Sequence, residues 1–463
     1  MKTFFRKIGA WLEDRTGIMA AITPILNHLV PPGAKWAYVF GSATLFCFIL
    51  QVVTGIGLAL LYQPSSDAAY QSLKFITDQA MFGRVLRGIH FFGASGMIIF
   101  VGVHMIRVYI MAAYKYPREM NWITGVFLLF LTIIMGFTGQ LLRWDSNGVW
   151  SSVVAAQNLG RIPLIGTTLA RLLLGGDTIG AQSLSRFFAY HVFLFPALIF
   201  GLIGLHLFLV IRNGISEPPK AGRPVDPKTY RKWYEAMLKR EGVPFWPDAA
   251  WRDAMFGALV IIAIVGLAIT FGPPALTQPP DPSLIKTTPA PDWYMLPIFA
   301  LFALVPPRTE SYLIFFGPVL AVGALLALPF LSGTGERSPI RRPWAVFGVV
   351  CVVIFVGALL VAGEIAPWSP RFDTKPVTEF VSYHNPQLER GAELFYKKGC
   401  QYCHMIRGEG GLKGPDLSLI GRTWTPDQLD VQIVNGKGGM PAYGGSLKQD
   451  ELRAIVAFLS VQK

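Results

Sequence analysis

Long apolar stretches separated by shorter polar ones run along most of the chain. An α-helix that crosses a bilayer needs about 20 mainly apolar residues. Stretches of that kind cover residues 38–62, 88–113, 122–142, 187–211, 252–272, 311–331 and 344–363. The pattern therefore predicts seven membrane-spanning helices. Residues 4–12 have the periodicity of an amphipathic helix lying on a membrane surface, and residues 450–461 that of a final amphipathic helix.

The distribution of charge gives these helices a direction. The chain is 52% hydrophobic and 15% charged, which is too apolar for an ordinary soluble enzyme. A net charge of +13 is compatible with nucleic-acid binding, but Lys and Arg gather in the N-terminal segment and in every second connection. This is the positive-inside pattern, and nothing else favours nucleic acid. We expect a cytoplasmic N-terminus, and seven crossings then put the segment after residue 364 on the opposite, positive (p) side.

Two of the four cysteines form Cys400-Gln-Tyr-Cys403-His404, the attachment pattern of a c-type haem. The two thiols add to haem vinyl groups, and the histidine supplies an axial nitrogen to the iron. A zinc site would need further Cys or His ligands, and residues 385–463 contain none outside this motif. In Gly438-Gly439-Met440-Pro441, the Met440 thioether is the expected second axial ligand. Core packing is the alternative for Met440.

Four of the seven histidines fall in two predicted spans, His90 and His104 in the second and His191 and His206 in the fourth. Steps of 14 and 15 residues leave helical offsets of about 40° and 60°, so each pair shares one face about 21–22 Å apart along the axis. Both spans run from outside to inside, so His90 matches His191 in depth and His104 matches His206. A lone membrane histidine is commonly a hydrogen-bonded core residue. Two matched pairs predict two bis-histidine b haems, stacked as an electron path across the membrane.

Glycines repeat this spacing in the first and third spans. Gly41 and Gly55 are 14 residues apart, and so are Gly125 and Gly139. A residue without a side chain permits a cofactor to approach closely, whereas small-residue helix packing is the alternative. The recurrence of 14 favours clearance for the two haems.

Residues 36–216 resemble cytochrome b of bc complexes, and specifically the four-helix cytochrome b6 of the b6f branch. The resemblance rests on the His and Gly framework and on Gln51-Val-Val-Thr-Gly55, Arg107-Val-Tyr109, Lys115-Tyr-Pro-Arg-Glu119, Trp122-Ile-Thr-Gly125 and Gly214-Ile-Ser216. The 15-residue step from His191 to His206 is also that of the b6 branch. Residues 250–364 resemble its separate subunit IV, and residues 386–463 resemble a class I cytochrome c domain.

The resemblance implies an all-α fold, a seven-transmembrane-helix haem-binding bundle with a C-terminal cytochrome c domain. The expected parts are a cytoplasmic-side amphipathic segment at 1–35, a cytochrome b6-like domain at 36–216, a cytoplasmic linker at 217–249, a subunit IV-like domain at 250–364, a linker at 365–385 and the cytochrome c domain at 386–463.

Pro291-Asp292-Trp293-Tyr294 is similar to the PEWY signature of the family, with Asp in place of Glu. In the family this element lines the p-side quinol oxidation site, and its carboxylate helps to take a proton from quinol. The alternative is an interfacial anchor in a Pro-rich loop. The shorter Asp makes menaquinol plausible as the substrate.

Cys47 lies eight residues before Gly55, in the span where b6-type proteins have a cysteine that bonds a third haem, called ci. We place Cys47 in the cytoplasmic part of its span, at the depth of His104 and His206, and predict that third haem there. The alternative is a small buried hydrophobic residue. Cys351 in the seventh span is assigned to packing.

Four arginines flank the predicted haems. Arg87 and Arg186 precede the outer histidines at family positions that can pair with haem propionates, and Arg107 and Arg212 are candidates at the inner side. Their alternative role is snorkelling to the membrane interface.

The resemblance implies quinol oxidation with electron bifurcation, coupled to proton translocation. One electron passes through a Rieske iron–sulfur protein to the c haem. The other crosses the two b haems to a quinone on the inner, negative (n) side. Expected partners are the Rieske protein, a soluble or membrane-bound cytochrome c, quinol and membrane lipids, in a homodimer within a larger complex of the bacterial cytoplasmic membrane.

Two other functions fit part of the pattern. A non-bifurcating dihaem anchor of another respiratory oxidoreductase would pass electrons linearly to the c haem, but it needs neither the Pro291–Tyr294 loop nor three further helices. A transporter or channel with a redox-sensing c domain would need a polar path through the spans, whose histidines stand only at haem spacing.

Overall fold

The structure is a computed structural model that describes residues 2–176, 178–280, 289–366, 373–411, 414–436, 440, 443–444 and 447–463. It comprises two compact units. Unit 1 is Met1–Pro279 with Tyr312–Val356, and unit 2 is Pro280–Ser311 with Gly357–Lys463.

Helices long and apolar enough to cross a membrane number seven in the part of the chain that the structure describes. They are α3 (Phe40–Ala59), α5 (Gly83–Ile110), α6 (Glu119–Leu141), α9 (Ala181–Ala189) continued by α10 (Phe195–Asn213), α12 (Ala250–Thr270), α14 (Pro307–Leu331) and α15 (Pro343–Ile365). Each coincides with one of the predicted spans. The prediction of seven membrane helices is therefore confirmed, and the chain is a multi-pass membrane protein.

The outward faces of these helices are apolar. Phe316, Ile354 and Phe355 are each at least half exposed, and only 6% of the most apolar window of α15 is buried. In water such a surface would be very unfavourable, so hydrocarbon is the solvent that suits it.

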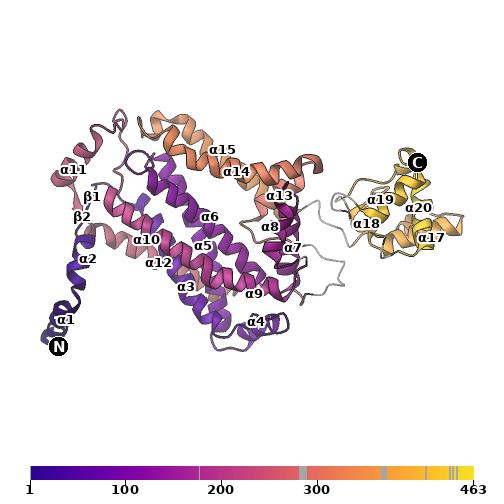
Figure 1. Cartoon of the computed structure of the whole chain (residues 1–463), viewed down its shortest axis with the longest axis horizontal. Coiled ribbons are helices and arrows are strands. Elements are labelled where there is room, and N and C mark those ends of the chain that lie inside the picture. The colour runs from indigo at the N-terminus through magenta and orange to yellow at the C-terminus, as the bar shows by residue number, and fades with distance from the viewer. Residues whose placement is uncertain are drawn as a thin grey trace. The chain divides into compact units, whose positions relative to one another are not determined.

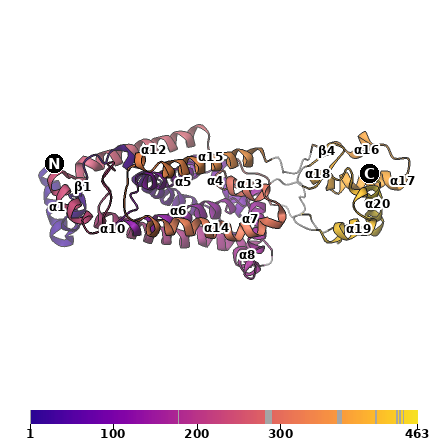
Figure 2. The same ribbon diagram turned by 90° about the horizontal axis from the view of Figure 1, so that it is seen from above.

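Shorter elements sit at the two ends of the unit 1 bundle. Its long helices run from the end that carries α1 (Lys2–Thr16), α2 (Ile18–Leu26) and α11 (Tyr230–Glu241) to the end that carries α4 (Ala69–Asp78), α7 (Ser146–Gly160) and α8 (Gly166–Leu174) (Figures 1 and 2). We call the first the N-terminal end. There, β1 (Leu29–Val30) pairs antiparallel with β2 (Val243–Pro244).

Several helices of unit 1 pack around a shared apolar core. Helix α5 packs against both α3 and α12, while α6 packs against α10. The core contains Phe48 of α3, Met97 of α5, Ile199 of α10 and the pair Val260 and Ile264 of α12. The first helix after the cytochrome b6-like part thus shares the same core.

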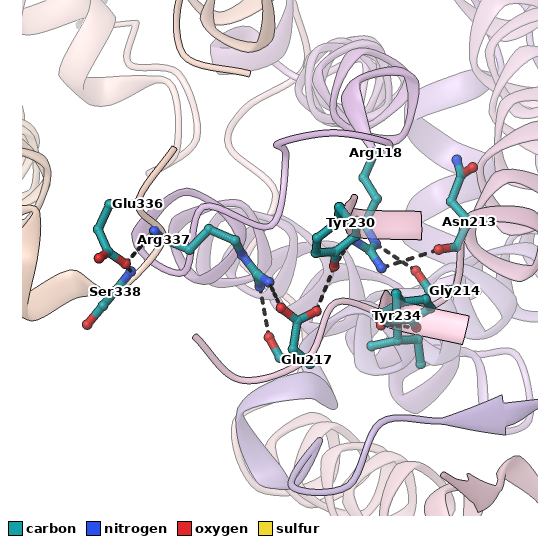
Figure 3. Close-up of polar contacts among 10 residues, drawn as sticks. Arg118, Asn213, Gly214, Glu217, Tyr230, Tyr234, Glu336, Arg337 and Ser338 are labelled. Atoms are coloured by element: carbon teal, nitrogen blue, oxygen red, sulfur yellow. Dashed lines mark hydrogen bonds and ion pairs between the residues drawn. The ribbon is translucent and has the colours of Figure 1, made fainter. Parts of the chain in front are cut away.

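A buried polar network ties the segment after α10 to the rest of unit 1 (Figure 3). Arg118 donates to the Tyr230 hydroxyl at 2.9 Å and to the Gly214 carbonyl at 2.8 Å. Tyr230 donates to the Glu217 carboxylate at 2.7 Å, and Glu217 forms an ion pair with Arg337, which is 2% exposed. Removing one partner of a buried ion pair costs about 3–5 kcal/mol. The chain between α10 and α12 is therefore held firmly to the loop between α14 and α15.

Unit 2 contains α13 (Leu296–Leu304) and, at its C-terminus, a small helical domain. The elements of that domain are α16 (Val377–Phe380), α17 (Pro386–Lys397), α18 (Cys400–Cys403), β3 (Met405–Ile406) paired with β4 (Glu409–Gly410), α19 (Pro426–Asn435) and α20 (Gln449–Ser460). Helices α17 and α20 pack together, and Phe395, Ile406, Ile455 and Phe458 fill the core. The helix predicted at 450–461 is α20.

Part of the expected linker at 365–385 belongs to the core of this domain. Val377 is fully buried in the core, and its N–H donates to the Gln401 side chain at 3.2 Å. Gln401, also fully buried, donates in turn to the Thr374 hydroxyl at 3.0 Å and to the Lys375 carbonyl at 2.6 Å. Residues 374–377 are thus fastened to the turn between the two motif cysteines.

Candidate haem-binding sites

His90 of α5 and His191, between α9 and α10, face one another inside unit 1. Their ring centroids are 6.2 Å apart, with the ring planes at 70°. Two metal–nitrogen bonds of about 2 Å each would take up most of the distance between the ring centres. The distance from each ring centre to its nitrogen accounts for the rest. The geometry accommodates one iron between the two side chains.

A glycine lies against each of the four membrane histidines, one glycine to one ring. A Cβ atom added at Gly139 would lie 2.7 Å from the His191 ring, at Gly41 3.0 Å from His104, at Gly55 3.3 Å from His90 and at Gly125 3.6 Å from His206. The 14-residue glycine spacing therefore matches the two histidine layers in depth. These glycines make room for the imidazole rings as well as for a cofactor beside them.

Threonines bond three of the four rings. The Nδ1 atom of His90 is 2.9 Å from the Thr54 hydroxyl, that of His206 is 2.8 Å from Thr124, and that of His191 is 3.1 Å from Thr138. Each hydroxyl donates its own proton to a backbone carbonyl of its helix, Leu50 for Thr54, Met120 for Thr124 and Met135 for Thr138.

These contacts decide the tautomer of the three rings. A hydroxyl has one proton, and because each threonine has given it to a carbonyl, the oxygen can only accept from the ring. Nδ1 of His191 also lies 3.1 Å from the Met135 carbonyl, which is an acceptor alone. The proton therefore sits on Nδ1, and Nε2 keeps the lone pair that a metal needs.

His104 is held differently. Among the described residues its Nδ1 is joined to Arg107 Nη2, at 3.4 Å, and an arginine can only donate. The guanidinium of Arg107 lies 4.7 Å from the centre of the Tyr38 ring, and its Nε is buried without a partner within the described residues. A positive charge thus stands beside one histidine of the His104–His206 layer.

A π-helical turn at Tyr190–Leu194 contains His191. Such a turn accommodates one extra residue in a helix and is frequent at functional sites. It accounts for the 15-residue step to His206, since the added residue is absorbed and both rings face α6. The sequence-based offset of about 60° assumed a regular α-helix throughout, so it did not include this turn.

In the C-terminal domain too, a histidine ring has an acceptor at Nδ1 and a glycine against it. Cys400 and Cys403 begin and end the single turn of α18, and His404 follows it in extended conformation. The His404 Nδ1 donates to the Pro415 carbonyl at 2.9 Å, and a Cβ at Gly414 would collide with its ring. Burial lowers the pKa of His404, so the ring is neutral and its Nε2 is available to a metal.

Met440 packs against the core of the same domain and accepts a weak hydrogen bond from Gln432 at 3.7 Å. Gly438, Gly439 and Pro441 lie outside the described residues. Ligation by Met440 stays a prediction, as does haem ligation by each histidine.

The Pro291–Tyr294 segment leads into α13. The Tyr294 hydroxyl lies 3.5 Å from the Asp292 carboxylate, and the backbone carbonyl of Asp292 accepts from the Met295 N–H at 2.8 Å. Burial and the neighbouring carboxylate raise the pKa of Tyr294 well above its usual value. Tyr294 therefore stays protonated and points a donor toward Asp292. Trp293 packs edge to face on Tyr294, with 5.8 Å between the ring centroids.

Three of the four predicted arginines have partners other than the histidines or face outward. Arg87 is buried and donates to the Thr77 hydroxyl and the Pro274 carbonyl, both at 2.9 Å. Arg186 is exposed and donates to the Leu172 carbonyl at 3.1 Å, and Arg212 is exposed. The structure brings only Arg107 of this set against a histidine.

Cys47 does not lie where we predicted. It is six residues beyond Gly41 and eight before Gly55, which puts it near the middle of the span between the two histidine layers. Its side chain is fully buried in the apolar core, and its sulfur is 3.4 Å from the Cβ position of Gly96. The prediction that Cys47 shares the depth of His104 is wrong, and the third haem at Cys47 stays a prediction.

Comparisons with known proteins agree with this geometry. Residues 25–214 match the family described as Cytochrome b/b6/petB, and residues 386–459 match "Cytochrome C oxidase, cbb3-type, subunit III". The menaquinol:cytochrome c reductase cytochrome b subunit of Bacillus subtilis is 39% identical over 220 residues, which are 46% of this chain and 98% of that relative. The chain belongs to the cytochrome b/b6 family. The cytochrome b6 of Heliobacterium modesticaldum is 40% identical over 210 residues, 45% of this chain and 99% of that relative.

A solved structure extends the similarity beyond this first half. A chain of "Hyperthermophilic respiratory Complex III" superposes with a TM-score of 0.65 at 25% identity, over 85% of this chain and 96% of that one. The chain is therefore a cytochrome b with a C-terminal cytochrome c domain, and these domains imply haem of the b type and of the c type.

The threonines are the site residues that sequence reasoning missed. Their signal is visible in the sequence, because Thr54, Thr124 and Thr138 each directly precede one of the four glycines. The fourth glycine, Gly41, follows Phe40 instead, and its partner His104 is the ring that has no threonine.

Proposed function

We propose that this chain is the cytochrome b subunit of a bc-type quinol oxidoreductase, in which quinol oxidation sends one electron across the membrane and one to a c-type haem. The observation that carries the proposal is the pair of facing imidazoles of His90 and His191, each with Nε2 left free, together with a second pair of histidines, His104 and His206, at another depth of the same bundle. The Cys400–His404 motif on the same chain supports it. The names of the relatives, which include a menaquinol:cytochrome c reductase subunit, agree with this class of reaction.

In this proposal two b haems are held by His90 with His191 and by His104 with His206. The haems supply one-electron transfer when bound. The residues of the chain orient the ligands: Thr54, Thr124 and Thr138 hold the Nδ1 protons and so keep Nε2 free. Removing a hydrogen-bond partner that orients a metal ligand typically lowers metal affinity about 10- to 100-fold.

Quinol oxidation is assigned to the Pro291–Tyr294 segment. The Asp292 carboxylate accepts a proton from the quinol hydroxyl, and Tyr294 stabilises the charged form of Asp292 by donating to it. Because Tyr294 keeps its own proton, it serves as donor and not as base. Pro291 and Trp293 shape the loop around this pair. Menaquinol is the proposed substrate.

The remaining steps follow from the family. A Rieske iron–sulfur protein takes the first electron and passes it to the domain that carries His404 and Met440, which then reduces a soluble or membrane-bound cytochrome c. The second electron passes from the His90–His191 layer to the His104–His206 layer and on to a quinone, with proton translocation. We place the complex, as a homodimer within a larger assembly, in the bacterial cytoplasmic membrane with the N-terminal end of the bundle on the n side and residues 386–463 on the p side.

The decisive experiment is a pyridine haemochrome assay on the purified chain together with its intact mass. Two b haems and one covalent c haem per chain are expected. Reduction of both b haems by menaquinol in the presence of an oxidised Rieske partner would support bifurcation. A complex that contains no Rieske protein and passes electrons linearly from b to c haem would instead identify a non-bifurcating dihaem anchor. Absence of b-type absorbance would exclude the proposal.

A further inference from the structure

The haem-attachment motif of the C-terminal domain contains a residue that the attachment chemistry does not use. Cys400, Cys403 and His404 bind the haem and its iron in that chemistry, whereas Gln401 lies between the cysteines on α18. Its side chain is nevertheless fully buried. A buried amide is unfavourable unless its polar atoms have partners, so the partners of Gln401 show what it holds.

The polar atoms of this side chain bind one short segment. Oε1 of Gln401 accepts from the Val377 N–H at 3.2 Å, and Nε2 donates to the Thr374 hydroxyl at 3.0 Å and to the Lys375 carbonyl at 2.6 Å. An amide group has two N–H donors and one carbonyl acceptor, and here each of them is used. We call residues 374–383, which begin at this contact, the docked segment.

The backbone of the docked segment explains why a polar residue is needed at position 401. Lys375 lies outside any helix or strand, and Val377 is the first residue of α16, so its N–H has no partner within that helix. Buried backbone groups require a partner. An apolar side chain in place of Gln401 would leave both of these groups unpaired. Gln401 therefore holds the backbone of the docked segment, besides filling part of the core.

The rest of the docked segment is fixed by packing. Val377 and Val381 belong to the core of the domain. The Tyr383 ring packs edge to face on Phe458 with the centroids 5.6 Å apart, and its hydroxyl accepts from the Gln462 side chain at 2.8 Å. The docked segment thus contacts the domain at both of its ends, with Gln401 holding the end that is nearer to α15 in sequence.

Docking of this segment shortens the connection between α15 and the domain. Helix α15 ends at Ile365 and α17 begins at Pro386, whereas the docked segment begins already at Thr374. An extended chain spans about 3.4 Å per residue, so Thr374 can lie at most about 30 Å from Ile365, and Pro386 at most about 70 Å if the docked segment is released. Because volume grows with the cube of this distance, docking reduces the space open to the domain about tenfold.

We propose that Gln401 is a positioning residue, which holds the docked segment and so limits how far the c-type haem can travel from the end of α15. It acts through the backbone of the docked segment and touches no reacting group. The inference does not depend on the quinol reaction, because it requires only a cytochrome c domain that follows α15. A haem on a short connection has a high effective concentration for partners bound to its own complex, and exchanges electrons with them rather than with those of a neighbouring complex.

Hydrogen exchange of the whole haem-loaded protein tests the contact directly. In wild type the Val377 amide should exchange as slowly as the amides of α17. Gln401→Leu nearly keeps the side-chain volume but removes all three hydrogen bonds, so the docked segment should exchange on the order of 100-fold faster, while α17 and α20 keep their protection. Gln387→Leu, at an exposed glutamine of α17, is the matched control. Equal protection in Gln401→Leu and wild type would overturn the proposal.

Electron paramagnetic resonance measures the reach of the domain. Spin labels on Glu364→Cys and Glu389→Cys, both at exposed positions, in a Cys351→Ser background, give the distance distribution between the end of α15 and α17. Gln401→Leu should widen this distribution and move its mean to a larger distance, whereas Gln387→Leu should match the wild type. An unchanged distribution in Gln401→Leu would contradict the limit on reach.

The content and reduction potential of the c-type haem separate release of the docked segment from unfolding of the domain. Both should stay at their wild-type values in Gln401→Leu, because the cysteines and His404 are unchanged. If this variant loses its haem, Thr374→Val decides, since it removes one of the three hydrogen bonds and leaves residue 401 as it is. It should accelerate exchange of the docked segment by a smaller factor, about tenfold. Unchanged exchange in Thr374→Val would refute the inference.

Discussion

The two histidine layers of the bundle differ in what surrounds them. In the His90–His191 layer both rings donate Nδ1–H to threonines, and the two rings face each other at 6.2 Å. In the other layer His206 has Thr124, but His104 has the guanidinium of Arg107. In the first layer each ring is held by a threonine, whereas in the second layer the guanidinium of Arg107 lies against one of the rings.

This difference suggests a direction for the electron. A positive charge near a haem stabilises its reduced form and so raises its reduction potential. Arg107 lies within 3.4 Å of the His104 ring, while Arg87, at the other end of α5, contacts Thr77 and Pro274 rather than a histidine. We therefore expect the higher potential at the His104–His206 haem, which would draw the electron away from the side to which we assign quinol oxidation.

The largest expected effect comes from removing a ligand of the first layer. His191→Leu should eliminate one of the two b haems and leave the other, because the layers share no ligand. Haem content by pyridine haemochrome, with redox titration of the remaining haem, measures this. Loss of both haems in a protein that still folds would show that the layers are not independent.

A glycine comparison on α6 tests the packing around the rings. Gly139→Ala adds a methyl group 2.7 Å from His191, so the ring must move, whereas Gly125→Ala adds one at 3.6 Å from His206, an ordinary contact. Overpacking of this kind costs about 1–3 kcal/mol. Gly139→Ala should lose haem from the first layer while Gly125→Ala retains both. Equal haem retention in the two variants would contradict the assigned clearances.

Thr138→Val tests the role assigned to the threonines. It removes the hydroxyl acceptor of the His191 Nδ1–H, leaves the Met135 carbonyl as the other acceptor and keeps shape and volume. We therefore expect about 10-fold weaker haem binding in the first layer, the lower end of the usual range. Thr132→Val is the matched control, since Thr132 is similarly buried on α6 and, within the described part of the chain, bonds the Leu128 carbonyl and no histidine. Haem dissociation rates to a haem-scavenging globin compare the two. Similar rates would assign Thr138 to helix packing.

Arg107→Gln should abolish most of the difference between the layers. Removing a unit charge at roughly 8–16 Å with an effective dielectric constant of about 20 changes the free energy of reduction by on the order of 1–2 kcal/mol. The His104–His206 haem should fall in potential, and the other haem should hardly change. Potentiometric titration resolves the two. A fall in the reduction potential of the His90–His191 haem instead would show that the charge of Arg107 acts on the other layer.

The smallest effect is expected at Cys47, which lies between the layers. Cys47→Ala should leave the intact mass of the chain lower by the side-chain difference alone, with haem content unchanged. Loss of a haem mass in this variant would restore the third haem that the apolar packing of Cys47 disfavours.

Much of this architecture can be predicted from the sequence, because a bilayer imposes a length on each helix and a spacing on each ligand pair. Seven apolar stretches, the 14-residue repeats and the Cys400–His404 motif are local patterns, so no knowledge of packing was needed to interpret them. Even the threonines could be found, since they adjoin the glycines.

Only the tertiary structure decided what depends on contacts between helices. It assigned each glycine to one histidine, placed Cys47 between the layers and brought Asp253 to Ser42, 211 residues away in sequence. It also showed the π turn at His191, which changes the phase of one face of a helix relative to the rest. A sequence pattern gives the face and depth of a residue on its own helix, whereas the identity of its neighbour depends on how separate helices pack, and that is a property of the whole chain.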